Sequence, residues 1–213
     1  MKKISFLSVI LFSVTVAISA QAYESTIQYD KKKQTAISID YGYPSKAVEN
    51  AIVQRMEKLG YRAREEKGIL NRDKGFLVFK NAYVTDITDV KIDYIIKVER
   101  KSRKESDETV LYMILAKDGD NAINKLPPAD ITSAKSYLNN LLPDIEAANL
   151  ELNIKAQEEV VAKAEKKLQD LKDDQLNLER KLQENKTGQE ATQKDIEAQK
   201  QALGTLIGKR NTN

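Results

Sequence analysis

Two periodicities of apolar residues divide the chain near Pro127 and Pro128. Before these prolines, apolar side chains recur at every second position in short runs, which is the period of β-strands covered on one face. After them, apolar side chains recur at alternating steps of three and four, which is the period of helices that pack along one face. The pattern predicts an α+β body over residues 23–128 and a helical extension over residues 129–213.

Three runs give the strongest strand signals in the body. Residues 37–41 alternate apolar and polar side chains, and so do residues 92–98 except at Ile95, whereas residues 110–116 are apolar throughout. A continuous apolar run is typical of a central strand that is buried on both faces. Residues 25–29 and 76–79 are two further candidates. We expect mainly antiparallel pairing, with a hairpin between the second and third of the strong runs.

One helix is predicted between the first strong strand run and the next strand, because its start, its apolar face and its end agree. Ser45 after Pro44 is suited to cap the start, and Gly60 supplies the left-handed stop. The apolar face comprises Val48, Ala51, Ile52, Met56 and Leu59. One helix against mainly antiparallel strands makes a small two-layer sandwich, so the expected fold class is α+β.

Pro143 divides the helical extension, since a proline inside a helix removes a hydrogen bond and clashes with the preceding turn. We therefore predict a short docking helix within residues 129–142, whose apolar face packs on the body. That face comprises Ile131, Ala134, Leu138 and Leu141. Pro143 itself suits the first turn of a second helix, where its missing N–H does no harm.

A coiled-coil seam follows Pro143, with residues at alternating steps of three and four over five heptads. Its members are Ala147, Leu150, Ile154, Gln157, Val161, Ala164, Leu168, Leu171, Gln175, Leu178 and Leu182. Residues 185–188, which read Asn-Lys-Thr-Gly, interrupt this pattern. A second seam then comprises Thr192, Ile196, Gln199, Leu203 and Leu206.

A reversal of the chain at Thr187 would place the two seams against each other. Positions whose numbers sum to 374 then face one another, so that core leucines meet apolar or Thr side chains and Gln175 meets Gln199. A buried polar pair of this kind specifies register. Residues 143–213 are therefore predicted to form an antiparallel coiled-coil hairpin, with a continuous rod as the alternative.

The returning helix of this hairpin would be about 30 Å shorter than the outgoing one, at ~1.5 Å of rise per residue. The first part of the seam, from Ala147 to Val161, then still needs a covering surface. The candidates are the protein's own sheet, a second copy of the chain, or another protein bound as a client. The last two make the arm a site of self-association or protein binding.

Composition removes most catalytic chemistry from consideration. The 213 residues include no His and no Cys, so Ser-His-Asp and Cys-His nucleophile systems, His-based acid–base catalysis and the usual zinc sites lack their central group. The acidic residues near positions 86–93 and 118–121 do not follow the calcium-loop pattern. We expect no catalytic, cofactor-binding or metal site, and carboxylate- or Lys-based catalysis is the remaining enzymatic alternative.

The first 22 residues have the pattern of a cleaved secretory signal. Lys2 and Lys3 precede an apolar stretch over residues 4–19, and residues 20–22 read Ala-Gln-Ala, a small-x-small cleavage site. We predict that the mature chain begins at Tyr23 and that the protein is periplasmic or secreted, as in bacteria. Cleavage would remove Lys2 and Lys3, which leaves 33 of the 35 basic residues and all 32 acidic residues in the mature chain. This balance does not favour nucleic-acid binding.

The densest basic cluster lies at the tip of the hairpin predicted after residue 98. It comprises Arg100, Lys101, Arg103 and Lys104. Such a cluster can contact anionic headgroups at a membrane surface. Because acidic residues stand on both sides of it, the alternative is a solvated turn that discourages edge pairing.

These patterns predict an exported, non-enzymatic interaction or scaffolding protein whose coiled-coil arm binds a partner. The seam residues expected to make the contact are Leu150, Ile154, Val161, Leu168, Leu171, Gln175, Leu178, Leu182, Ile196, Gln199, Leu203 and Leu206. In architecture alone, the small body with its helical hairpin resembles tentacle-type periplasmic holdase chaperones. That resemblance implies the alternative function of binding unfolded exported proteins, which needs an exposed apolar concavity.

Overall fold

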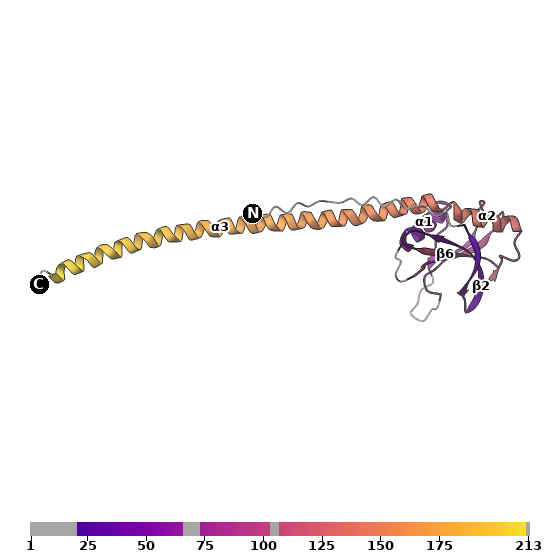
Figure 1. Cartoon of the computed structure of the whole chain (residues 1–213), viewed down its shortest axis with the longest axis horizontal. Helices are drawn as coiled ribbons and strands as arrows, with labels where there is room; N and C mark the ends of the chain where they lie inside the picture. Colours follow the sequence, from indigo (N-terminus) through magenta and orange to yellow (C-terminus); the bar gives the residue numbers. More distant parts are fainter. Residues whose placement is uncertain (1–20, 66–72, 103–106, 212–213) are drawn as a thin grey trace. The chain divides into compact units, whose positions relative to one another are not determined.

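The computed structural model describes residues 21–65, 73–102 and 107–211 (Figure 1). The predicted secretory signal lies outside the described residues, except for Gln21 and Ala22. The chain divides into two compact units. We call them the body unit, which ends at Ile154, and the arm unit, which begins at Lys155.

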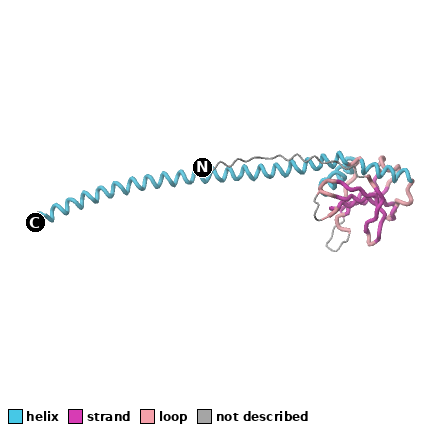
Figure 2. The backbone as a smooth tube through the Cα atoms, in the orientation of Figure 1, coloured by secondary structure: helices cyan, strands magenta, loops and turns pink. Residues whose placement is uncertain are grey.

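The fold is α+β, as the sequence predicted, with an antiparallel sheet followed by a long helix (Figure 2). In chain order the elements are β1 (Tyr23–Tyr29), β2 (Lys32–Tyr41), α1 (Ser45–Lys58), β3 (Arg64–Glu65), β4 (Phe76–Ala82), β5 (Ile92–Arg100), β6 (Thr109–Lys117), β7 (Asp120–Asn121), α2 (Pro128–Asn139) and α3 (Leu142–Asn211). The described strands form one sheet in the order β1-β2-β6-β5-β4-β3, and β7 pairs with β6.

β6 lies inside the sheet, as its continuous apolar sequence predicted. It forms the predicted hairpin with β5, in which Met113 faces Ile96, and its other edge pairs with β2, where Met113 faces Ile37. Met113 and Leu115 enter the main core with the buried face of α1, whereas Ile114 belongs to a smaller cluster that Phe76 and Ile95 share. Because successive side chains of a strand point to opposite faces, β6 is buried on both faces.

The smaller cluster is closed by curvature of the sheet itself. Tyr29 on β1 and Phe76 on β4 place their ring centroids 4.8 Å apart, although β2, β6 and β5 lie between these strands in the sheet order. The Asp30 N–H also donates to the Asp73 carboxylate at 3.1 Å. The two ends of the sheet therefore approach each other on the face that lies opposite α1.

Helix α1 covers the main core, and its bounds lie close to those predicted. Its buried side chains are Ala47, Val48, Ala51, Ile52 and Met56. Gly60 has φ +88°, and the Tyr61 N–H bonds back to the Met56 carbonyl at 3.0 Å, as at helix ends that need a left-handed residue. Two details of the prediction are wrong: Pro44 rather than Ser45 is the N-cap, with no side-chain cap bond, and Leu59 is exposed because it follows the last helical turn.

Helix α2 and the start of α3 complete the main core. The buried residues there are Ala134, Tyr137, Leu138, Leu141, Ile145 and Ala148. The apolar face predicted ahead of Pro143 is therefore present, with its first member, Ile131, only partly buried. Pro143 lies in the first turn of α3, where it was expected. α2 and α3 are separate helices because this proline prevents one helix from continuing through residues 139–143.

The predicted reversal at Thr187 is wrong. Helix α3 runs from Leu142 to Asn211 as one α-helix of 70 residues (Figures 1 and 2). Asn, Thr and Gly each weaken a helix by about 1 kcal/mol or less relative to Ala, whereas Pro weakens it by ~3 kcal/mol, and no Pro occurs here. Thr187 donates its hydroxyl proton to the Gln183 carbonyl at 3.1 Å, and Gln189 donates to the Asn185 side chain at 2.6 Å. These polar residues are accommodated by bonds along the helix.

None of the described helices is both long enough and apolar enough to cross a membrane.

Candidate interaction surface

The large aliphatic residues of the predicted seam lie on α3 with exposed side chains. Their exposed fractions range from 42% at Ile196 to 66% at Leu178. The set comprises Leu150, Ile154, Val161, Leu168, Leu171, Leu178, Leu182, Ile196, Leu203 and Leu206. Every residue from Lys155 to Lys209 is exposed. Since most helical stability in proteins comes from packing of an apolar face, a helix of this kind is suited to association.

The two seams predicted separately share a single heptad frame, which sequence reasoning missed. At position a the frame contains Ala147, Ile154, Val161, Leu168, Gln175, Leu182, Gln189, Ile196 and Leu203. At position d it contains Leu150, Gln157, Ala164, Leu171, Leu178, Asn185, Thr192, Gln199 and Leu206. Asn185 and Gln189 fill the two positions between the seams without a change of phase. The seven-residue steps from Leu182 to Gln189 and from Gln189 to Ile196 are the sequence signal of this continuity.

The middle of the seam forms a shallow apolar depression along one side of α3. Leu171, Leu178 and Leu182 line it together with Gln175, and Asp174 and Glu179 lie at its margin. Apolar side chains in the centre with charged side chains beside them are typical of a coiled-coil contact surface. The long helix is thus compatible with a coiled coil.

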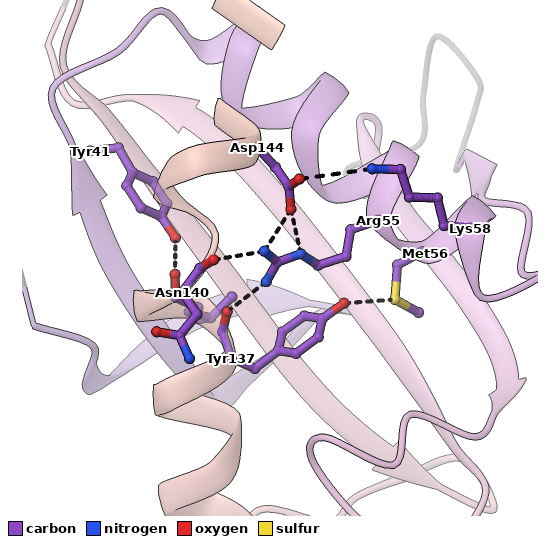
Figure 3. Close-up of polar contacts among 8 residues, drawn as sticks. Tyr41, Arg55, Met56, Lys58, Tyr137, Asn140 and Asp144 are labelled. Atoms are coloured by element: carbon purple, nitrogen blue, oxygen red, sulfur yellow. Dashed lines mark hydrogen bonds and ion pairs between the residues drawn. The ribbon is translucent and has the colours of Figure 1, made fainter. Parts of the chain in front are cut away.

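Arg55, on the last turn of α1, holds the junction between α2 and α3 (Figure 3). Its Nε donates to the Asp144 carboxylate at 2.6 Å, and its Nη2 donates to the Asn140 carbonyl at 2.7 Å. Its Nη1 donates to the Tyr137 carbonyl at 3.2 Å, and the guanidinium lies 5.1 Å from the centre of the Tyr137 ring. One side chain therefore satisfies the last carbonyls of α2 and an acidic residue in the first turn of α3.

Tyr41 adds a second contact to the same junction. Its hydroxyl donates to the Leu138 carbonyl at 2.6 Å, in a buried setting (Figure 3). Sequence reasoning identified neither Tyr41 nor Arg55, because their partners lie 82 to 97 residues away along the chain. The one nearby feature of the sequence that singles out Arg55 is its place directly before Met56, a core residue in the last turn of α1.

The structure describes only half of the predicted basic cluster. Arg100 ends β5, and the Lys101 amine lies 3.5 Å from Asp40 and 3.4 Å from Glu108. Arg103 and Lys104 lie outside the described residues. Because two carboxylates already neighbour Lys101, they raise the pKa of its amine and offset its attraction for an anionic surface.

The other polar features of the body unit are a set of dispersed ion pairs and one small recess. Across residues 21–65, 73–102 and 107–211, no group of three or more His, Cys, Asp or Glu side chains is placed to hold a metal ion. A small polar recess of about 200 Å³ lies beside the α2–α3 junction, and its lining includes Arg55, Asp86, Ser136 and Tyr137. Arg55 is already occupied by the contacts described above.

Comparison of the chain with protein-family models, with curated proteins and with solved structures finds no match.

Three buried tyrosines predict a loss of stability in alkali. Burial raises the pKa of Tyr137 to about 12, against the opposing effect of Arg55, and burial also raises the pKa values of Tyr41 and Tyr94. A raised pKa in the folded state means that this contribution to stability is complete below about pH 10 and is lost as the pH rises toward 12. The free energy of unfolding should fall by about 1.4 kcal/mol per pH unit for each such tyrosine.

Urea unfolding between pH 9 and 12, monitored by the near-ultraviolet signal of the tyrosines, measures this slope. In Tyr137→Phe, the free energy of unfolding should fall less steeply with pH, by the contribution expected from one tyrosine. Tyr83→Phe is the matched control, because Tyr83 is 42% exposed. Identical slopes for the wild type and Tyr137→Phe would show that the Tyr137 phenol does not resist ionisation.

Proposed function

We propose that this is an exported, non-enzymatic interaction or scaffolding protein that binds a protein partner through the α3 seam. The observation that carries the proposal is the exposure of ten large aliphatic side chains in one heptad frame on a single helix. Burial of such a face on a partner removes apolar surface from water, which stabilises the complex by ~25 cal/mol for each Å² of apolar surface buried. A surface with this geometry fits a second amphipathic helix better than it fits a small ligand.

The location at the cell exterior or periplasm rests on the signal pattern in residues 1–22. β1 begins at Tyr23, so cleavage after Ala22 would leave every described strand complete. The absence of His and Cys from the sequence supports a binding role over a catalytic one.

A holdase chaperone is the second candidate function, and the same exposed leucines favour it, because unfolded chains bind to apolar surface. The two candidates differ in the number of partners. A coiled-coil surface with fixed heptad positions selects one or a few helices, whereas a holdase binds many unrelated unfolded proteins.

The test is mild crosslinking and recovery of the tagged protein from the exported fraction. The wild type is compared with the Leu171→Glu, Leu182→Glu double variant, and with Leu176→Glu as the matched control. Leu176 is 65% exposed on α3 but lies at position b, outside the seam and its flanking e and g positions. We expect discrete crosslinked species with the wild type and with Leu176→Glu, and their loss with the double variant.

Many heterogeneous clients would instead identify a holdase. Species that persist in the double variant would show that the seam is not the binding surface. The intact mass of the recovered protein tests export, since a chain beginning at Tyr23 is expected.

A further inference from the structure

We propose that a second copy of this chain covers the α3 seam as an antiparallel partner, in the register where facing positions sum to 353. The proposal rests on the proposed function, because it identifies the partner of the same seam. Two observations carry it: the continuous heptad frame from Ala147 to Leu206, and the charges that flank this frame.

Charges at the e and g positions beside a seam determine the orientation in which two helices pair. On α3 the charged e residues are Glu151, Glu158, Glu165, Lys172, Glu179, Lys186 and Lys200. Within the frame from Ala147 to Leu206, the charged g residues are Lys167, Asp174, Lys181 and Asp195. All of them are exposed and can reach a partner helix.

A parallel, in-register pair of copies would bring like charges together. In that orientation each g residue faces the e residue five positions later on the partner. The resulting pairs are Lys167 with Lys172, Asp174 with Glu179, Lys181 with Lys186 and Asp195 with Lys200. Only the last pair is attractive, and each pair occurs twice in a symmetric dimer.

An antiparallel pair removes these conflicts in one register. In antiparallel coiled coils a residues face d residues, e residues neighbour e residues, and g residues neighbour g residues. When facing seam positions sum to 353, the flanking charged pairs are Glu151 with Lys200, Glu165 with Lys186, Lys172 with Glu179 and Asp174 with Lys181. All four pairs are attractive, and this register has no pair of like charges at e or g.

The same register covers the whole seam. Ala147 faces Leu206 of the partner copy, and Leu150 faces Leu203, so both ends of the frame are matched. Near the middle, Leu171 faces Leu182. The overlap extends over about nine heptads, well beyond the three or four that a coiled coil needs.

The register with a sum of 374, which describes a folded-back hairpin, also describes an antiparallel pair of chains. It pairs Gln175 with Gln199, but it places Lys172 beside Lys200 and leaves the seam before Leu168 uncovered. The register with a sum of 353 instead places glutamines opposite aliphatic side chains, as with Gln175 and Leu178. The flanking charge pairs and the covered length of the seam favour the register with a sum of 353. The glutamine layers make this dimer weaker than one with a fully aliphatic seam.

Cysteine bridging tests both orientation and register, because the chain has no native Cys. The variants Leu171→Cys, tagged Leu182→Cys and tagged Leu203→Cys are prepared separately, mixed in pairs and oxidised at low protein concentration. Leu171→Cys with Leu182→Cys should bridge at least tenfold more than Leu171→Cys with itself or with Leu203→Cys. In the proposed register only the first pair lies within the ~7 Å that a disulfide allows, whereas Leu171 lies ~16 Å from its own symmetry mate.

A substitution at Lys172 gives a second test whose sign depends on orientation. In the antiparallel dimer, Lys172→Glu turns the attraction between residue 172 and Glu179 into a repulsion. In the parallel dimer, the same substitution removes a repulsion between Lys172 and Lys167. The residues three and four positions away are Leu168, Gln169, Gln175 and Leu176, none of them charged. We expect Lys172→Glu to weaken dimerisation about three- to tenfold at low salt, and Glu179→Lys added to it to restore the affinity.

Bridging of Leu171→Cys with itself, or tighter dimers of Lys172→Glu, would overturn the proposal in favour of a parallel dimer. Preferred bridging with Leu203→Cys would establish the other antiparallel register. Monomeric sedimentation with no bridge in any mixture would exclude a second copy. The proposed function would then depend on the crosslinking experiment alone, where another seam-dependent partner would preserve it.

Discussion

Glutamate at both Leu171 and Leu182 should dissociate any assembly that forms through α3. In the proposed dimer these positions face each other, so four carboxylates would enter one part of the seam. Burial of unpaired charges there costs several kcal/mol, which corresponds to a rise in the dissociation constant of roughly a thousandfold. Sedimentation equilibrium should show a monomer at concentrations where the wild type is a dimer.

The same variant should also lose helix content. Every described side chain of the arm unit is exposed in the single chain, and an unpacked helix depends on intrinsic propensity alone, which is marginal in water. Circular dichroism should therefore show a smaller helical signal and a broader melting transition. Leu176→Glu should change neither mass nor melting, because position b points away from the seam. A double variant that matched the wild type in both measurements would show that the seam is exposed to solvent.

Replacement of Arg55 by Met should destabilise the body unit by about 2–4 kcal/mol. The change leaves Asp144 without its closest cation and removes the donors from the Tyr137 and Asn140 carbonyls. Arg55 and Asp144 are only 22% and 30% exposed, so water replaces these contacts poorly. Met preserves much of the aliphatic volume, which limits the contribution of lost packing.

Lys58→Met is the matched control for Arg55. Its amine lies 3.9 Å from the same carboxylate, but its side chain is 72% exposed, so its loss should change stability by less than about 0.5 kcal/mol. All nine tyrosines lie between Tyr23 and Tyr137, so tyrosine fluorescence in a denaturant titration reports on the body unit alone. Equal effects of the two variants would mean that Arg55 acts only as a surface charge.

The predictable parts of the fold are those determined by local patterns. The alternation in β5, the continuous apolar run of β6 and the stop at Gly60 each follow from residues within a few positions of one another. The Arg55 contacts could not be predicted, because donors and acceptors on different helices leave no spacing signal in one sequence.

The reversal at Thr187 failed for a different reason. Residues 185–188 weaken a helix but do not prevent it, and the match between positions that sum to 374 follows from any antiparallel pairing. The same pairs of residues are brought together whether the second helix belongs to the same chain or to another. A pairing pattern alone therefore cannot distinguish a hairpin from a dimer, whereas the structure can, because α3 continues through residues 185–188 as one helix.

The position of β6 between β2 and β5 has a consequence for the order of folding. Ile37 and Met113 are partners across this pair of strands although the whole of α1, β4 and β5 lies between them in sequence. Closing such a long loop is slow compared with forming a helix, whose contacts are all local. During synthesis the hairpin of β1 and β2 must wait, with an unpaired edge, until β6 emerges. α3 can become helical as soon as its residues appear, so this helix needs less time to acquire its structure than the sheet does.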